Sequence, residues 1–233
     1  MGNVFKWLAI SVGSVLALGA LALVLWVAGR LTHAFDFYQT PSNANAPTFI
    51  IGDQFFISRW VKPERLDFIA YRSSLPEDGP TVFSHRLCGL PGDTVELRRS
   101  RLFVNGQDLD LGLQLVHHYA LARADYARLP RPLFKDTTGI IPIGDSLYQV
   151  GLADADAARP ALRAVRKVQP AGYRNPAILN VFPAGRNEDN FGPVVVPAGA
   201  YFVLGDNRQN ARDSRYIGWV RQADVVGTVL GQH

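Results

Sequence analysis

The stretch between Lys6 and Arg30 constrains the fold more than any other part of the sequence, because residues 7–29 carry no charge. As a helix this stretch extends roughly 35 Å, enough to cross a hydrocarbon core of about 30 Å. Trp7 and Trp26 lie near its two ends, where indole rings favour the membrane interface. The run is longer than the roughly 7–15 apolar residues of a cleaved signal peptide. We therefore predict a transmembrane anchor over residues 7–29, preceded by a short N-terminal segment, residues 1–6.

The charges that flank this anchor leave its orientation open. Lys6 and the free amino terminus favour an N-terminus on the inside, whereas Arg30 favours the opposite orientation.

The composition of the remaining chain favours β-structure. Charged residues make up 19% of the chain, which contains 21 glycines and 15 prolines, so turns are frequent. The formal charge of +4 is spread thinly; it suits contact with anionic lipid headgroups, and no Lys/Arg block indicates a nucleic-acid partner. Cys88 is the single cysteine and cannot form an intramolecular disulfide, so we expect a small buried apolar side chain there.

Apolar runs separated by turn signals predict a series of strands. Asn105-Gly106, Pro91-Gly92-Asp93 and Pro197-Ala198-Gly199 are typical turn sequences between such runs. The expected strands cover residues 49–51, 55–57, 67–71, 81–87, 94–97, 101–104, 194–196 and 201–204. The strand pattern weakens from 112 to 186, and residues 152–168 have Ala and Arg at helical spacing, interrupted by Pro160. We therefore predict a mostly β core over 30–111 and 187–233, with an inserted α/β lobe over 112–186.

Four segments follow the anchor in a specific order. They are Pro41 to Thr48 followed by Gly52-Asp53, then Ser84-His85-Arg86 leading into Gly89 to Asp93, then Asp189 to Pro193, and finally Gly205 to Arg208 continuing to Asp213 through Tyr216. This set resembles the type I signal peptidases, membrane-bound serine endopeptidases that remove signal peptides from exported proteins. The Gly-Leu-Pro-Gly-Asp and Gly-Asp-Asn-Arg runs are the most specific parts of the resemblance.

The resemblance implies a β-sheet peptidase fold held at a bacterial inner (plasma) membrane by a single-pass anchor. It also implies an N-terminus inside and a main domain on the outer, periplasmic face. An extended peptide or signal peptide is the expected partner, in a cleft that includes Tyr38, Pro41 and Ser84. No metal-ligand spacing or phosphate-binding glycine loop is evident and the family needs no cofactor, so we expect neither a metal nor a cofactor.

The position of the family's nucleophile is occupied by an alanine. The family's first motif reads Pro-Ser-x-Ser-Met-x-Pro-Thr, and its second serine attacks the peptide bond. In this chain that position is Ala44, whose methyl group cannot attack a carbonyl. The family's methionine is Asn45. Ser42 is retained at the position that donates to the oxyanion, but it lies two residues from Ala44, roughly 6–7 Å along an extended chain, so it does not replace the nucleophile.

The position of the general base is also changed. The bacterial family has a lysine where this chain has His85, although histidine serves as the base in the microsomal branch of the family. A family serine that helps to hold the lysine is Ala211 here. Asp213 is retained and is expected to orient neighbouring groups, or to pair with Arg215 or Arg86. Ser84 adjoins His85 but points to the other face of a strand.

Three hypotheses follow from these substitutions. The chain is an inactive signal-peptidase-like protein that binds peptides, or an enzyme whose serine is replaced by Ala44 in this sequence, or a structural subunit of a membrane complex. Changes at Ala44, Asn45, His85 and Ala211 together favour natural decay of the site, because an inert variant needs only one substitution.

Overall fold

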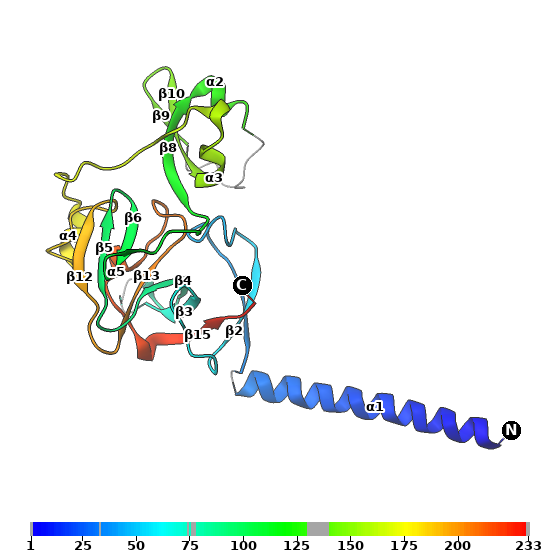
Figure 1. The fold of residues 1–233 in the computed structure, drawn as a ribbon. Coiled ribbons are helices and arrows are strands. Elements are labelled where there is room, and N and C mark those ends of the chain that lie inside the picture. The colour runs from blue at the N-terminus through cyan, green and yellow to red at the C-terminus, as the bar shows by residue number, and fades with distance from the viewer. Residues whose placement is uncertain (1, 33, 74, 76–77, 130–139, 232–233) are drawn as a thin grey trace.

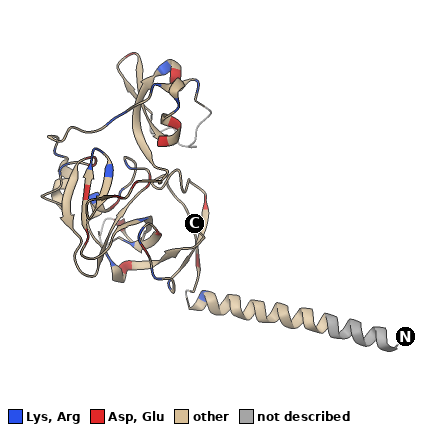
Figure 2. Ribbon diagram, viewed as in Figure 1, with Lys and Arg blue, Asp and Glu red and all other residues tan. Residues whose placement is uncertain are grey.

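The N-terminal helix projects from a body made of strands (Figure 1). The computed structural model describes residues 2–32, 34–73, 75, 78–129 and 140–231, with the backbone alone for residues 2–11. Helix α1 covers Gly2–Leu31, and its segment Val12–Leu31 is long and apolar enough to cross a membrane. Side chains along this segment point outward, and Arg30 is the charged residue at its domain end (Figure 2). The predicted N-terminal helix is confirmed, while the Trp7 side chain lies outside the described residues.

The main body is built around an antiparallel sheet of seven strands. Its order is β1-β2-β15-β3-β4-β13-β14. The strands are β1 (Asp36–Gln39), β2 (Gln54–Ser58), β3 (Phe68–Arg72), β4 (Val82–Gly89), β13 (Ala200–Leu204), β14 (Val220–Arg221) and β15 (Val225–Val229). Short helical turns α5 (Ser214–Ile217) and η3 (Gln222–Asp224) connect its last strands.

A second antiparallel sheet packs beside the first in the order β12-β5-β6-β7. Its strands are β5 (Thr94–Arg98), β6 (Arg101–Val104), β7 (Gln107–Asp108) and β12 (Phe191–Val195). Two tight turns shape this sheet, and both use left-handed backbone: Arg99 and Ser100 have φ of 53° and 69°, and Asn105 and Gly106 have φ of 52° and 80°. A core cluster that includes Val95, Leu102 and Phe202 joins the two sheets.

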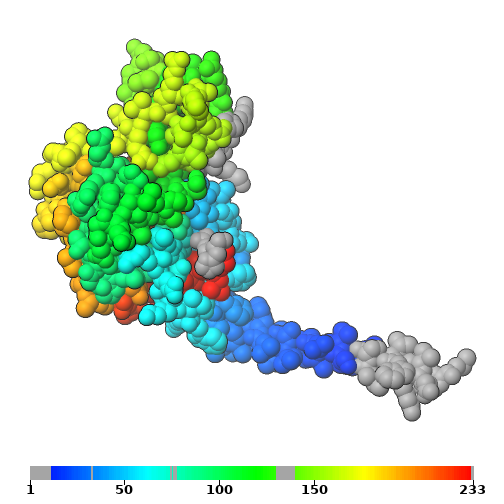
Figure 3. All heavy atoms as spheres, viewed as in Figure 1, coloured from blue at the N-terminus to red at the C-terminus, as the bar shows by residue number. Residues whose placement is uncertain are grey.

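A separate lobe rises from one end of the body (Figures 1 and 3). Its sheet has the order β11-β8-β10-β9 and its own apolar cluster. The elements are β8 (Val116–Ala122), α2 (Arg123–Tyr126), β9 (Ile141–Ile143), β10 (Leu147–Ala153), α3 (Asp154–Ala157), η2 (Pro160–Leu162) and β11 (Val165–Arg166). The predicted fold class, mostly β with an N-terminal helix and an α/β lobe, is confirmed.

The boundaries of the lobe, 112 and 186, stay predictions. Residues 130–139 lie outside the described residues. Helix α4 (Pro176–Val181) falls within the predicted lobe, yet Ile178 and the adjacent Phe182 pack in the core cluster of the second sheet.

Two sequence-based expectations are wrong. Residues 49–51 form a turn and not a strand, because side chains bind the backbone there: Asn43 Oδ1 accepts from Ile51 N at 3.1 Å, and Asp53 Oδ2 accepts from Ile50 N at 2.9 Å. The helical spacing over 152–168 produces only the single turns α3 and η2. The start of that stretch belongs to β10, whose residues pair with β8.

The edge of the main sheet next to α1 carries exposed aromatic side chains. Phe37, Phe56 and Trp60 are 46%, 50% and 71% exposed. Phe35 connects them to the helix, since its ring packs edge-on against Phe56 and lies against Gly29, where a Cβ would sit 2.2 Å from the Phe35 ring. The end of α1 and this apolar edge therefore form one continuous surface.

Candidate functional site

The loop that contains Ala44 is fastened to the segment that follows β13. Asn207 N donates to the Ala44 carbonyl oxygen at 3.0 Å, and Asn207 Nδ2 donates to the Asn43 carbonyl oxygen at 3.2 Å. Ala44 is half-buried, and its amide lies 3.4 Å from the Ser42 hydroxyl, which is exposed. The first and fourth motifs of the sequence analysis therefore meet at Ala44.

Gly205 brings Ala44 and Ala211 together. A Cβ at position 205 would lie 2.4 Å from the Ala44 carbonyl oxygen and 2.4 Å from the Ala211 Cβ. Only a glycine permits such an approach. Two positions that the sequence analysis assigned to the site, Ala44 and Ala211, thus both lie against Gly205, and neither supplies a hydroxyl.

The first motif also contacts the root of the lobe. Ala46 is fully buried in a small cluster with Val116 and Ala153. Val116, at the start of β8, exchanges backbone hydrogen bonds with the fourth motif: its amide donates to Asp206 O at 3.0 Å and its carbonyl accepts from Arg208 N at 2.9 Å. The lobe therefore begins directly beside the loop that carries Ala44.

His85 lies on β4 and is 2% exposed. Its Nδ1 is 2.7 Å from the Tyr71 hydroxyl, and its ring stacks on Phe83 at a centroid separation of 6.4 Å. Burial lowers the pKa of His85 from 6.5 to about 4, although the negative charge of Asp213 acts in the opposite direction. His85 is therefore neutral near pH 7.

Tyr71 was not identified from the sequence. It lies on β3, where it pairs with Phe83, while Ile69 pairs with His85. Tyr71 and His85 are thus diagonal neighbours on one face of an antiparallel pair, within reach of long side chains. Burial raises the pKa of the Tyr71 hydroxyl, and the nearby charge of Asp213 adds to this, so the phenol keeps its proton. Knowing the register of β3 against β4 would have identified Tyr71 as a neighbour of His85.

Asp213 is engaged by an arginine and by backbone amides. It forms a fully buried ion pair with Arg215, with Arg215 Nη2 2.7 Å from Asp213 Oδ2. Its Oδ2 also accepts from Gly205 N at 3.1 Å, and its Oδ1 caps α5 by accepting from Arg215 N. Pairing with Arg215, one of the expected alternatives, is confirmed. Among the described residues, Asp213 has no hydrogen bond to His85.

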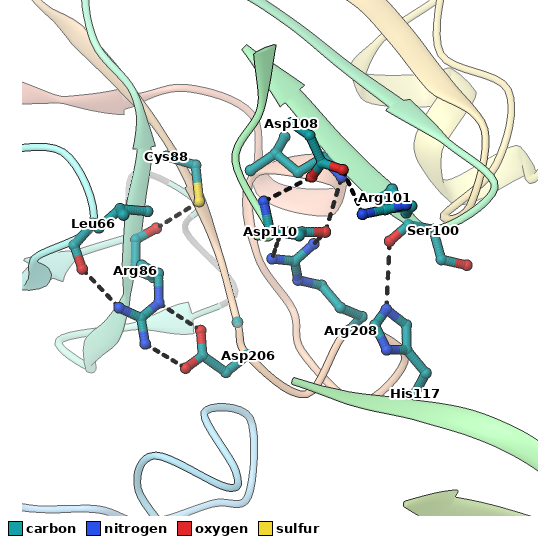
Figure 4. Close-up of polar contacts among 12 residues, drawn as sticks. Leu66, Arg86, Cys88, Ser100, Arg101, Asp108, Asp110, His117, Asp206 and Arg208 are labelled. Carbon is teal, nitrogen blue, oxygen red and sulfur yellow. Dashed lines mark hydrogen bonds and ion pairs between the residues drawn. The ribbon is translucent and has the colours of Figure 1, made fainter. Parts of the chain in front are cut away.

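Arg86 does not pair with Asp213 and binds Asp206 instead. Its Nε and Nη2 lie 2.8 and 2.6 Å from the two carboxylate oxygens (Figure 4). Its guanidinium covers the Phe68 ring at 4.3 Å. Thr48 of the first motif donates to the same carboxylate. This bidentate pair ties the first, second and fourth motifs together. Arg208 makes a similar buried pair with Asp110, which the sequence analysis also missed (Figure 4).

Asn45 connects the Ala44 loop to β4. Its Nδ2 donates to the Ser84 carbonyl oxygen at 2.6 Å. Its Oδ1 and the Ser84 hydroxyl are both buried without a hydrogen-bond partner among the described residues. Asn45, which follows Ala44, is thus bonded to Ser84, which precedes His85. The Asn45 Oδ1 and Ser84 Oγ atoms remain without partners among the described residues.

The other two residues expected to line a cleft have different surroundings. Tyr38 on β1 is half-buried and stacks on Phe55 at 6.4 Å, so its ring packs against the apolar cluster that includes Phe55 and Phe68. Pro41 is exposed. Within the described ranges, no group of three or more His, Cys, Asp and Glu side chains is placed to hold a metal ion. Cys88 is fully buried as expected, and burial raises the pKa of its thiol to about 12.

Comparison with known proteins decides the family. Residues 11–231 match the family model described as signal peptidase, peptidase S26. The chain belongs to the signal peptidase family. Signal peptidase I P of Bacillus subtilis subsp. natto is 27% identical over 212 residues, which cover 89% of this chain and 80% of that protein. Signal peptidase I of Aquifex aeolicus strain VF5 is 27% identical over 205 residues, covering 82% and 72%.

A signal peptidase I from Enterococcus faecalis V583 is a related solved structure. It is 27% identical, covers 72% of this chain and 97% of its own, and superposes with a TM-score of 0.35. The resemblance drawn from the four motifs of this chain is confirmed by the family match. Signal peptidase relatives and the apolar helix α1 together agree with a membrane-anchored protein.

Proposed function

We propose that this member of the signal peptidase family binds extended peptides at the membrane without cleaving them. One observation carries the proposal: Ala44 occupies the nucleophile position with its backbone fastened by Asn207, so the loop is held in place but no hydroxyl is present. The helix α1 holds the domain at a bacterial inner membrane, with the N-terminus inside and the domain on the periplasmic face.

No neighbouring hydroxyl takes the place of the missing nucleophile. Acyl transfer needs a nucleophile within hydrogen-bond reach of its base. The Ser42 hydroxyl lies at the Ala44 amide, and the described part of the chain shows no bond between Ser42 and His85. The Ser84 hydroxyl has no partner at all among the described residues. His85 itself bonds to Tyr71, a phenol, and not to a serine.

The retained framework supports the binding part of the proposal. The ion pair of Arg86 with Asp206, to which Thr48 also donates, holds three motifs in one arrangement, and the pair of Arg215 with Asp213 stabilises the fourth. The strand β1 is the outer strand of the main sheet, directly before the Ala44 loop, and an outer strand can accept an extended peptide by strand addition. Tyr38, Pro41, Ser42 and Ser84 are the residues that we assign to the peptide site, and Asp213 supports it by holding Gly205 beside Ala44.

The test uses the purified full-length chain in detergent. A preprotein with small residues at −3 and −1 is incubated with the protein, and a fluorescent peptide with the same residues is titrated in parallel. We expect saturable peptide binding without cleavage, and Ser146→Ala, on an exposed hairpin, to leave binding unchanged. Turnover of the preprotein that His85→Ala abolishes would overturn the inactive assignment.

A second candidate function is an active peptidase whose natural serine stands where this chain has Ala44. The presence of His85 favours this candidate, because a histidine can act as the general base and only the serine nucleophile is then missing. The variant Ala44→Ser decides between the two: recovered cleavage supports the enzyme, and its absence supports decay of the whole site. Ala198→Ser, in an exposed turn, is the matched control.

A third hypothesis, that the protein is a subunit of a membrane complex, is tested by copurification from gentle detergent. A strictly monomeric protein counts against this hypothesis.

A further inference from the structure

The hydrogen bond between Tyr71 and His85 joins two buried side chains of adjacent strands. Tyr71 is fully buried and His85 is 2% exposed. The Tyr71 oxygen and the His85 Nδ1 are 2.7 Å apart, so one of them must donate and the other accept. A neutral imidazole has one nitrogen with a proton and one without. The direction of this bond therefore determines which ring nitrogen of His85 carries the proton.

The surroundings of the phenol decide the direction. Across the described residues, the only hydrogen bond of the Tyr71 hydroxyl is the one to His85 Nδ1. If Nδ1 carried the proton and donated it, the buried phenolic O–H would be left without an acceptor. A buried donor without a partner is strongly disfavoured. The phenol therefore donates, and Nδ1 accepts with its lone pair.

The carboxylate that could reverse this arrangement is occupied. In a serine peptidase triad, a carboxylate accepts from the Nδ1 proton and leaves Nε2 free to act as the base. Here Asp213 is bonded to Arg215 and to the Gly205 amide. Its charge acts on His85 from a distance, and Arg215 opposes it. A phenol, and not a carboxylate, is the group at Nδ1.

We infer that Tyr71 is a positioning residue that holds His85 in the tautomer with the proton on Nε2. In this tautomer His85 is a hydrogen-bond donor and not a proton acceptor. The lowered pKa of His85, about 4, agrees with a neutral ring at pH 7. The contact of His85 with a peptide rests on the proposed function. In the proposed peptide site, His85 Nε2 donates its proton to an acceptor such as a backbone carbonyl oxygen of an extended peptide.

The tautomer is measured directly and without any peptide. The full-length chain is labelled with 15N-histidine in detergent micelles, and long-range 1H–15N correlations are recorded at pH 7, with His85→Ala to assign the signals. We expect the Nε2 of His85 to have the shift of a protonated nitrogen and Nδ1 that of an unprotonated one. The opposite pattern, or a mixture of tautomers, would overturn the inference.

Tyr71→Phe provides the matched variant because it removes only the hydroxyl. We expect its His85 signals to move toward a mixture of tautomers, whereas Tyr148→Phe, in the lobe, leaves the wild-type pattern unchanged. Unchanged His85 signals in Tyr71→Phe would show that Tyr71 does not set the tautomer. If Tyr71→Phe does not fold, the wild-type spectrum alone still decides which nitrogen is protonated.

The donor role toward a peptide is tested by exchanging His85. Glutamine retains an N–H donor but no basic nitrogen, so we expect His85→Gln to bind the fluorescent peptide within about threefold of wild type. His85→Ala should bind at least about tenfold more weakly, the loss of one hydrogen bond. Equal losses in both variants would overturn the donor role. A peptide that does not bind wild type contradicts the proposed function but leaves the tautomer result standing.

Discussion

Gly205 and Ala44 are in such close contact that any side chain at position 205 would collide with the Ala44 carbonyl oxygen, 2.4 Å from the place of a Cβ. The same Cβ would collide with Ala211. This approach joins the strand end at β13 to the loop that carries the nucleophile position. The site is thus held together by backbone contact as well as by its ion pairs.

Substituting this glycine should destabilise the protein. Gly205→Ala forces the Ala44 loop or the Ala211 segment to move, and such overpacking costs typically about 1–3 kcal/mol. We expect a lower midpoint in thermal unfolding monitored by circular dichroism. Gly172→Ala is the matched control, since nothing lies within 4 Å of a Cβ there. Equal stability of the two variants would show that the close approach is relieved without strain.

Removing the charge of Asp213 should have a larger effect. Asp213→Asn leaves Arg215 fully buried without its counter-ion, and breaking such a pair costs about 3–5 kcal/mol. Asp224→Asn, which affects a pair with the 66% exposed Arg221 side chain, should change stability far less, because water and salt screen an exposed pair. Chemical denaturation of both variants measures the difference. A loss below about 1 kcal/mol in Asp213→Asn would contradict the structural role of the pair.

The stability of the protein should fall as pH falls through the range in which unfolded histidine gains a proton. The pKa of His85 is lowered from 6.5 to about 4, so between these values the unfolded chain binds more protons than the folded one. The difference between the two pKa values corresponds to a loss of about 3 kcal/mol in the free energy of unfolding. This loss is absent above pH 6.5 and complete below pH 4. Denaturant unfolding from pH 7 to 4.5 measures it.

Carboxylates also titrate at the lower end of that range, so the contribution of His85 is read as a difference between variants. His85→Gln has no ring to protonate and should lose less stability than wild type between pH 7 and 4.5. Identical pH profiles for the two proteins would show that His85 is not the group responsible.

The sheet edge beside α1 should contact lipid. In liposomes, an environment-sensitive dye on Trp60→Cys should shift its emission to the blue, because Trp60 is an exposed apolar side chain two residues after β2. Val195→Cys is equally an exposed apolar position, but on β12 of the second sheet, and should show no shift. Cys88 is fully buried and should not take up the dye. The same emission at both positions would argue against an edge in the bilayer.

The strands of the body could be predicted because their turns have clear chemistry. Asn105-Gly106 adopts the left-handed backbone typical of the turn that the sequence indicated, and the hairpin of β6 and β7 follows from it. The expectation for residues 49–51 failed because their apolar character reflects packing of a loop: Phe49 is buried against Phe55 and Phe68 at 5.1 Å from each ring. Burial alone does not distinguish a strand from a packed turn.

The site was only partly accessible to sequence analysis. Motif spacing identified Ala44, His85 and Ala211 as the altered positions, and the structure places both Ala44 and Ala211 against Gly205. Tyr71 was missed because a tyrosine in a strand has no distinguishing pattern, and only the register of β3 against β4 brings it to His85. Contacts between strands that are distant in sequence depend on that register.

The packing of Phe35 against Gly29 has a mechanical consequence. The ring fills the space where a side chain at position 29 would stand, and Arg30 is also linked to Asp36 at 3.3 Å. The end of α1 is therefore fixed to the start of β1 by side-chain contacts and is not connected by a flexible linker alone. A bilayer whose thickness changes the tilt of the helix would therefore also change the angle between the outer strand of the sheet and the membrane.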